Sequence, residues 1–269
     1  MTAADHLERL ALSAALRLAL LRLDADGRRR LGALPRLGLA ADEAAALEPV
    51  ERIRRELATD TRPFVMQDFG AGTRAMTVLP EAPLAATRER TFAEVYRRAA
   101  VRPVWGRLLF RLARALEPRR VLELGTNLGV GACTLAAALE LNGRGRLVTV
   151  EGDPTLAEQA RDHLGRVPGG ERAEVVTGTF DAMLPAVLPQ HGPFDLVVLD
   201  GHHERAATLR YWGLIRPHLA PGACVVFDDV EPWKDVRAAW RTIRAEEPAA
   251  QALDLVKAGL LVLPVSGGA

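Results

Sequence analysis

The sequence has few cysteines, little aromatic character and no excess of charge of either sign. Its two cysteines, Cys133 and Cys224, form no CxxC motif, which indicates a reducing compartment. Lys+Arg 35 against Asp+Glu 34 leaves a net charge of +1, which argues against a dedicated binder of nucleic acid. Only Lys234 and Lys257 are lysines, and we interpret the abundance of arginine as coding bias rather than as an arginine patch.

A long uncharged apolar run is also missing. The leucine-rich stretch 7–23 is interrupted by four charged residues, so it falls short of the ~20 residues that span a bilayer. Asp5 and Glu8 stand where a secretory signal carries positive charge. The sequence therefore predicts a cytoplasmic protein with no membrane partner.

Four apolar stretches end in acids, glycines or both, and they are the most informative part of the chain. They are 121–129, 148–153, 195–204 and 225–229. In a parallel α/β sheet the strands are buried on both faces, and ligands bind beyond their carboxyl ends. The chemistry is therefore expected at the strand tips.

From residue 120 onward, strand and helix patterns alternate, which predicts an α/β fold with a Rossmann-like, doubly wound sheet of seven strands. The expected strands are 120–124, 146–150, 174–177, 195–200, 223–227, 252–256 and 260–264. The expected helices are 129–141, 154–165, 180–188, 204–218 and 233–246. Only Lys257 to Gly259 separates the last two strands, so they must form an antiparallel hairpin.

The first part of the chain is predicted to be a helical extension. Residues 3–23 form a helix that ends at Asp24 to Gly27, and an apolar stripe on it comprises Leu7, Leu10, Ala11, Ala14, Leu18 and Leu21. A second helix is expected over 42–58, an irregular segment over 62–86 and a further helix over 92–116. The glycine-rich loop 68–73 is either a lid or an ordinary turn.

Two domains follow from this division. Residues 1–90 form a helical cap with a lid or interface segment, and residues 91–269 form the main domain. The leucine-rich first helix suits a homodimer interface. The alternative is a helical pair that merely shields the sheet.

The turn after the first strand, Gly125 to Gly129, decides which ligand is favoured. A dinucleotide site has a glycine in the middle of this turn, whereas this chain has Asn127. Glu151 is suited to accept hydrogen bonds from a ribose diol. Glu123 would repel a pyrophosphate but would attract a ligand that carries an ammonium and a sulfonium.

Residues 120–265 resemble class I S-adenosylmethionine-dependent methyltransferases. The Gly-Thr-x-x-Gly turn, Leu-Asp-Gly-x-His after the fourth strand and Asp-Asp after the fifth resemble bacterial O-methyltransferases related to catechol O-methyltransferase. Residues 67–74, Phe180-Asp181 and 228–233 also resemble a little-characterised bacterial branch of these proteins.

This resemblance implies an S-adenosylmethionine site. The residues expected to line the methionine part are Glu123, Gly125, Thr126, Asn127 and Gly129, with Glu151 on the ribose. Those expected to border the adenine are Thr179, Phe180 and Asp181, and Asp200 is expected to line the cofactor pocket.

Two devices could remove the acceptor's proton. Neighbouring strands would bring together Asp200, Asp228 and Asp229, and oxygen ligands favour Mg²⁺. In the catechol enzyme the last of these ligands is an asparagine. Alternatively, Asp200 lines the cofactor pocket without a metal. The second device is a histidine base: His203 stands where the catechol enzyme has its catalytic lysine, and His202 lies beside it.

The predicted function is methyl transfer from S-adenosylmethionine to a hydroxyl of a small molecule, with Asp200, His202 and His203 as catalytic candidates and Trp233 as an aromatic wall of the acceptor pocket. An N-methyltransferase is the nearest alternative. An NAD-dependent oxidoreductase and a non-catalytic cofactor-binding interaction module are the others.

Overall fold

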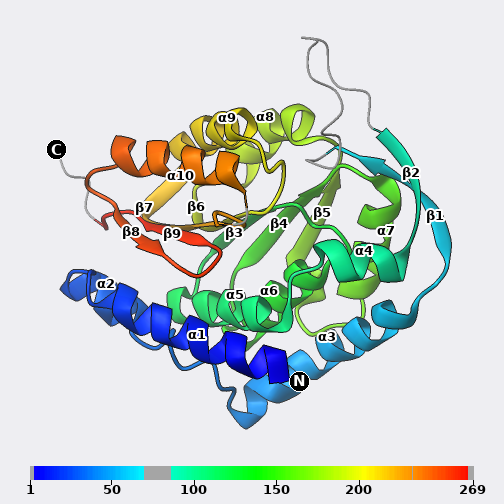
Figure 1. Cartoon of the computed structure of the whole chain (residues 1–269), viewed down its shortest axis with the longest axis horizontal. Coiled ribbons are helices and arrows are strands. Elements are labelled where there is room, and N and C mark those ends of the chain that lie inside the picture. The colour runs from blue at the N-terminus through cyan, green and yellow to red at the C-terminus, as the bar shows by residue number, and fades with distance from the viewer. Residues whose placement is uncertain (1–2, 70–85, 232, 266–269) are drawn as a thin grey trace.

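A central seven-stranded sheet organises the protein in the computed structural model, which describes residues 3–69, 86–231 and 233–265. The strand order is β5-β4-β3-β6-β7-β9-β8, and β9 runs antiparallel to both of its neighbours (Figure 1). The strands of the sheet are β3 (Arg120–Leu124), β4 (Arg146–Glu151), β5 (Ala173–Thr177), β6 (Phe194–Leu199), β7 (Leu219–Phe227), β8 (Gln251–Asp254) and β9 (Gly259–Val262). The expected fold class and the antiparallel hairpin are both confirmed.

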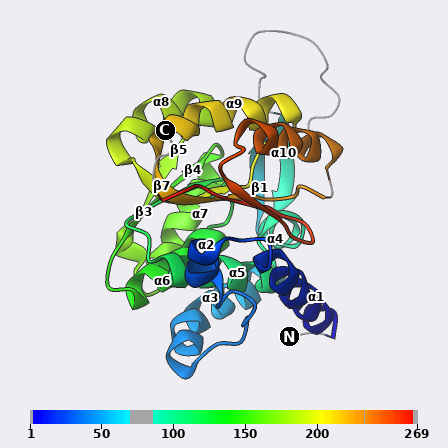
Figure 2. The same ribbon diagram turned by 90° about the vertical axis from the view of Figure 1, so that its left-hand side faces the viewer.

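Helices cover both faces of this sheet, because successive strand residues point to opposite sides. Val121 and Leu196 face one apolar core, whereas Leu122 and Val197 face the other. The first core is covered by α1 (Ala3–Leu20), α3 (Ala41–Thr59), α4 (Phe92–Ala99), α5 (Pro103–Leu116), α6 (Val130–Leu141) and α7 (Pro154–Leu164). The second is covered by α8 (Phe180–His191), α9 (Arg205–Ile215) and α10 (Lys234–Glu246), and Figure 2 shows the two layers.

Three local expectations are corrected. The single helix expected over 92–116 is two helices, because the peptide before Pro103 leaves the helical region and Pro103 starts α5. The helix expected over 3–23 ends at Leu20, and Asp24 caps a further short helix, α2 (Ala25–Leu31). The segment expected to be irregular contains strand β1 (Pro63–Asp68), which pairs with β2 (Ala86–Thr91).

The amino-terminal helices share one apolar core with the sheet. Leu12 and Leu16 of α1 and Ile53 of α3 are fully buried in the same cluster as α5 and α6. Arg54 of α3 donates to the carbonyl of Val101 at 2.6 Å, in the segment between α4 and α5. The extension therefore supports one wall of the main domain directly.

The apolar stripe expected on α1 lies on the solvent side of the helix. Leu7, Leu18 and Leu21 are 67%, 67% and 73% exposed, and Leu10, Ala11 and Ala14 are exposed as well. The buried residues of α1 lie on its other face. Within the described parts of the chain, no helix is long and apolar enough to cross a membrane.

The β1–β2 pair attaches to the tip of β4. The backbone N–H of Gln67 donates to Asp153 Oδ2 at 2.6 Å, while Asp153 Oδ1 accepts from Leu156 N and caps α7. Phe69, directly after β1, therefore lies against Gly152, where a methyl group would meet its ring. The rest of the loop expected to be a lid or a turn, residues 70–73, lies outside the described residues.

Candidate active site

Three turns meet at the carboxyl edge of the sheet, after β3, β6 and β7. Backbone hydrogen bonds from Asp200 N to Leu124 O and from Asp228 N to Leu199 O, both 3.0 Å, hold the three strand ends in line. Each turn contains a non-glycine residue with positive φ: Asn127 at 49°, His202 at 48° and Asp229 at 55°. Left-handed backbone is uncommon for such residues and occurs often at functional sites.

The first of these turns is closely packed against the second. Gly125 has φ 99°, and a side chain there would overlap the carbonyl oxygen of Asp200. Asn127 adopts the left-handed conformation at the place where a dinucleotide motif has its middle glycine. Gly129 faces Ala160 of α7 and allows that helix to lie close to α6. Gly129 does not line the cavity at the carboxyl edge of the sheet.

Glu123 is an acid buried under this turn. Only 3% of it is exposed, and its Oε2 accepts from Thr149 Oγ1 at 2.6 Å. Burial raises the pKa of Glu123 to about 8, with the Thr149 hydrogen bond opposing the shift and the charge of Glu151 adding to it. Gly131 leaves room for the carboxylate, since a methyl group there would overlap Oε1. The structure thus holds a carboxylate ready to ionise beside a cation.

Glu151, at the end of β4, is fixed by two backbone donors. Its Oε2 accepts from Asn127 N at 2.7 Å, and its Oε1 accepts from Asp153 N at 2.9 Å. Burial raises its pKa, which these two hydrogen bonds partly offset. Because each carboxylate oxygen can accept a second hydrogen bond, Glu151 can still bind a ribose diol.

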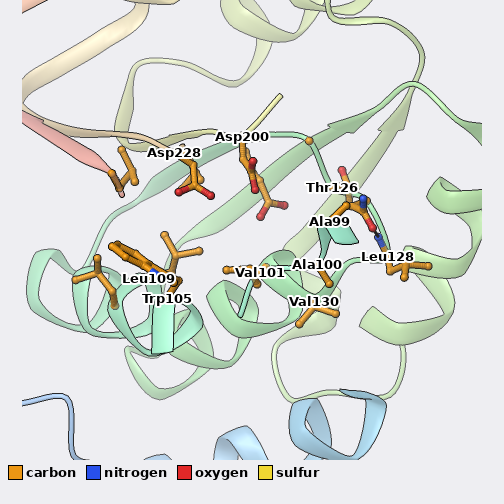
Figure 3. Close-up of a pocket in the computed structure, with 18 residues that line it drawn as sticks. Ala99, Ala100, Val101, Trp105, Leu109, Thr126, Leu128, Val130, Asp200 and Asp228 are labelled. Atoms are coloured by element: carbon orange, nitrogen blue, oxygen red, sulfur yellow. Dashed lines mark hydrogen bonds between the residues drawn. The ribbon is translucent and has the colours of Figure 1, made fainter. Parts of the chain in front are cut away.

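A cavity with an empty volume of about 560 Å³, including space open to solvent, extends from this turn to the tip of β7. Figure 3 shows Asp200 and Asp228 pointing into it, with Trp105 and Leu109 of α5 on the opposite side. Of the residues expected in the site, its lining contains Glu123, Gly125, Thr126, Asn127, Asp200 and Asp228. One space therefore joins the residues expected around the methionine part of the cofactor, apart from Gly129, to two of the three aspartates.

The residues expected around the adenine lie beside the tip of β6, where Phe180 is part of an aromatic group. Thr179 caps α8, and the Phe180 ring packs edge-on against His202 and Tyr211, at 5.5 and 5.3 Å between centroids. Asp181 pairs with Arg210 at 2.9 Å. These contacts place the three expected residues together, and their role toward adenine stays a prediction.

His202 is held by its surroundings. Its Nδ1 is 3.1 Å from the hydroxyl of Tyr211, and the ring also hydrogen-bonds to the backbone of Phe69. Burial lowers the pKa of His202, so the ring is neutral near pH 7. Because Tyr211 and the backbone of Phe69 occupy its polar atoms, His202 is better placed to hold the end of β1 against the site than to take a proton from an acceptor.

The aspartates at the tips of β6 and β7 have a lysine among them. Lys257 Nζ lies 2.8 Å from Asp228 Oδ2 and 3.2 Å from Asp229 Oδ1. Burial raises the pKa of Asp200 and of Asp228, the nearby carboxylates raise it further, and Lys257 opposes the shift. Burial also lowers the pKa of Lys257, but Asp228 and Asp229 more than offset this, so the ammonium is retained.

The arrangement does not fit the expected magnesium site. Asp228 and Asp229 both direct a carboxylate oxygen at the Lys257 ammonium. Among the described residues, which include all three aspartates, no group of three or more His, Cys, Asp or Glu side chains is arranged to hold a metal ion. A fixed cation already lies against two members of the expected Asp200–Asp228–Asp229 ligand set, which argues against that set as a magnesium site.

His203 lies on the other side of the same carboxylates. Its Nε2 is 3.7 Å from Asp229 Oδ2, and its ring stacks on Trp233 with 5.3 Å between centroids and 5° between planes. Burial lowers its pKa; Asp229 and Asp228 oppose this shift, and Lys257 adds to it. A neutral imidazole can accept a proton, which keeps His203 the better candidate for a base.

The sequence patterns did not identify Lys257 as a residue of this site. Lys257 stood only in a hairpin turn, although the antiparallel direction of β9, a usable signal, returns that turn to the tip of β7. Trp105 is one of several aromatic residues that could wall an acceptor pocket, but Trp233 was preferred because it directly follows a site strand. In the structure Trp105 lines the cavity and donates from Nε1 to Glu8 Oε1 at 2.9 Å.

Comparisons with known proteins agree with this geometry. A family model for a methyltransferase domain matches residues 122–230. The catechol O-methyltransferase of Mycobacterium tuberculosis is 40% identical over 148 residues, a match that covers 55% of this chain and 64% of that protein. A second catechol O-methyltransferase, from Niastella koreensis, is 33% identical, with 49% and 58% covered. The chain thus spans less than two thirds of the length of these curated relatives.

Solved structures extend the likeness to the fold. A cofactor-bound protein from MTB is 33% identical, with a TM-score of 0.54, covering 63% of this chain and 84% of that one. The O-methyltransferase TomG from Streptomyces achromogenes, solved in complex with SAM, is 29% identical, with a TM-score of 0.53 and coverages of 62% and 82%. The chain belongs to the class I S-adenosylmethionine-dependent methyltransferases.

Proposed function

We propose that this protein transfers a methyl group from S-adenosylmethionine to a hydroxyl of a small molecule. The observation that carries the proposal is the pair of buried acids, Glu123 and Glu151, on the two sides of the Gly125 turn. Carboxylates in a low-dielectric site favour a cationic ligand strongly. The family membership and the cofactor-bound relatives support the same cofactor.

The chain's own residues can hold each part of this cofactor. Glu123, beneath the turn, faces the amino and sulfonium charges of the methionine part, and Glu151 accepts from the ribose hydroxyls. The turn from Gly125 to Asn127 supplies close backbone approach, because a side chain at Gly125 is excluded. Phe180 borders the adenine. These four assignments are those that the family resemblance implies; the placement of Glu123, Glu151 and the Gly125 turn around the end of β3 supports them.

The chemical task left to the protein is modest. Bound S-adenosylmethionine supplies a methyl group on a positively charged sulfur, which leaves as a neutral thioether. The acceptor must be aligned and must lose its proton. His203 Nε2 takes that proton, the acceptor oxygen forms a bond to the methyl carbon, and the electron pair of the broken carbon–sulfur bond returns to sulfur. Asp229, 3.7 Å from Nε2, stabilises the imidazolium that results.

The same site ranks the alternatives. An acid in the place of Glu151 also binds the ribose in NAD sites, but Glu123 beneath the turn disfavours the pyrophosphate of NAD, which argues against an oxidoreductase. A histidine base beside an aspartate argues against a non-catalytic binding module, which has no need of a proton acceptor. An amine acceptor would also lose a proton to His203, so N-methylation stays the nearest alternative.

Calorimetric titration of S-adenosylhomocysteine and of NAD into the purified protein tests the cofactor. We expect micromolar binding of S-adenosylhomocysteine and none of NAD. Binding of NAD alone would reverse the assignment, and binding of neither would remove it. A screen of hydroxyl and amine acceptors with labelled S-adenosylmethionine then separates O- from N-methylation.

The exposed face of α1 supports a second, independent proposal: the protein is a homodimer whose copies meet through this helix. Leu7, Leu10, Leu18 and Leu21 form an apolar surface on the outer side of α1. Exposed apolar surfaces of this kind mark contact sites. The cytoplasmic location expected from the sequence also stays a prediction.

A further inference from the structure

Lys257 reaches the site because the strand that follows it, β9, runs antiparallel to β7. Strand β9 is antiparallel to β7, and Phe227 pairs with Gly259. The residue after Phe227 is therefore opposite the residues that precede Gly259. This register brings Lys257 beside Asp228 and Asp229, where its backbone carbonyl also accepts from Glu231 N at 3.3 Å.

The choice of lysine is unusual for this chain. Of 35 basic residues only two are lysines, and the other, Lys234, is exposed at the start of α10. Arginine carries a broad, planar group, whereas the lysine ammonium is a compact point charge. Two adjacent carboxylates in a small site can enclose a compact charge such as this ammonium, in the way that they would enclose a metal ion.

The ammonium is close to the cavity as well as to the carboxylates. Lys257 Nζ lies 5.3 Å from the centroid of the Trp105 ring, and Trp105 and Asp228 both line the cavity. The Lys257 side chain is 22% exposed. An ammonium has three N–H donors, and Asp228 and Asp229 use two of them. Among the described residues only these two carboxylates accept from Nζ, so the third N–H is available to an oxygen of a bound acceptor.

We propose that Lys257 is the built-in cation of this site: its ammonium takes the place of a divalent metal ion and donates to the acceptor oxygen while His203 removes the proton. A divalent ion at the same carboxylates would have to displace the ammonium or lie against a like charge. Methyl transfer by this protein is therefore independent of added metal. The inference about the acceptor rests on the proposed function, but the exclusion of metal does not.

Binding of Mn²⁺, followed by the loss of the electron paramagnetic resonance signal of the free ion, tests the exclusion without any acceptor. The wild type, Lys257→Met and Lys257→Arg are compared, with Lys234→Met as the control for loss of a lysine elsewhere. We expect the wild type, Lys257→Arg and Lys234→Met to leave Mn²⁺ free at sub-millimolar concentration. Lys257→Met should bind one Mn²⁺ at least about tenfold more tightly than the wild type.

Every other result overturns the proposal. One equivalent of Mn²⁺ bound to the wild type would show that lysine and metal coexist, and equal Mn²⁺ binding by the wild type and Lys257→Met would show that the ammonium does not hold a metal position. Thermal melts accompany the titration, because Lys257→Met leaves two carboxylates unpaired. If this variant fails to fold without Mn²⁺, its recovery on adding Mn²⁺ gives the supporting result, and failure to recover gives the opposing one.

Calorimetry with S-adenosylhomocysteine separates the two proposals. If the wild type binds neither S-adenosylhomocysteine nor Mn²⁺ and Lys257→Met gains Mn²⁺, the proposed function fails while the exclusion of metal holds. If an acceptor is found, EDTA should leave wild-type turnover unchanged, and loss of turnover in EDTA would overturn the inference.

Discussion

The imidazole of His203 lies parallel to the indole of Trp233, with 5.3 Å between the ring centroids and 5° between the planes. Stacking fixes the plane of the imidazole, and the contact with Asp229 fixes which edge faces the carboxylates. His203 is thereby positioned as a base, while the adjacent His202 is turned away by its left-handed backbone and held by Tyr211. Two neighbouring histidines have different surroundings and, we infer, different roles.

Replacing His203 by glutamine should slow methyl transfer by about 10²- to 10⁴-fold, the usual contribution of a positioned base. Affinity for S-adenosylhomocysteine should be unchanged, because the residues assigned to the cofactor are elsewhere. Turnover and calorimetry measure the two effects. His6→Gln, an exposed histidine on α1, is the matched control; a loss of less than about threefold in His203→Gln would remove the base assignment.

Glu151→Gln should weaken binding of S-adenosylhomocysteine by about 10- to 100-fold, since a hydrogen bond to a charged group contributes about 1.5–3 kcal/mol. The amide oxygen can keep one of the backbone donors, so the fold should persist. Glu174→Gln, an exposed acid on the neighbouring strand β5, serves as the control. Unchanged affinity in Glu151→Gln would contradict the ribose assignment.

Glu123 should make the cofactor-free protein less stable at alkaline pH. Its pKa is about 8 in the folded protein against 4.5 ordinarily, so folding favours the protonated form. That stabilisation is complete below pH 4.5 and is lost as the pH rises through 8, at about 1.4 kcal/mol for each pKa unit. Melting temperatures from pH 5 to pH 9, measured for wild type and Glu123→Gln, should diverge progressively. Parallel curves would show that Glu123 titrates normally.

Gly125→Ala should destabilise the protein by about 2 kcal/mol or more, because the added methyl group overlaps the Asp200 carbonyl and the backbone is left-handed. Gly213→Ala provides the opposite control. Gly213 lies in α9 with nothing near its added methyl group, so alanine there should stabilise the helix by about 0.5–1 kcal/mol. Urea unfolding measures the stability of both variants. Equal changes in stability at the two positions would contradict the close packing of the Gly125 turn on Asp200.

The variants Leu10→Lys and Leu18→Lys should convert a dimer to a folded monomer, with the melting temperature lowered only by the loss of the stabilisation that association provides. Both side chains are exposed, at 53% and 67%, so only a contact with a second copy would lose apolar area. Leu214→Lys, 37% exposed on α9, is the control. Light scattering that finds the wild type monomeric would remove the dimer proposal.

The sheet was predictable because its strands are buried on both faces. Mostly apolar runs such as 121–124, which contains Glu123, and 196–199 mark central parallel strands, and the acids and glycines that follow them mark the carboxyl edge. The β1–β2 pair was not predictable in this way. It is a two-stranded ribbon outside the main sheet, and exposed residues such as Val65 give it no clear alternation.

The apolar stripe of α1 shows where sequence periodicity fails. Leucines lie on more than one side of this helix, so the pattern could not say which side meets the core. Packing on α5 decided it, burying Leu12 and Leu16 and leaving Leu7 and Leu18 outside. Hydrophobicity predicted the helix, but only tertiary contacts chose its buried face.

The sequence by itself determined the order of strands and helices, the acids at the strand tips and the family, because each depends on local patterns of residue type. Only the tertiary structure decided the charge balance among Asp200, Asp228 and Asp229. Lys257 lies 29 and 28 residues after Asp228 and Asp229 and still further from Asp200, and no local pattern links it to them. The antiparallel return of β9 brings its ammonium to the carboxylates, and over such short distances a single charge changes which ion the site can accept.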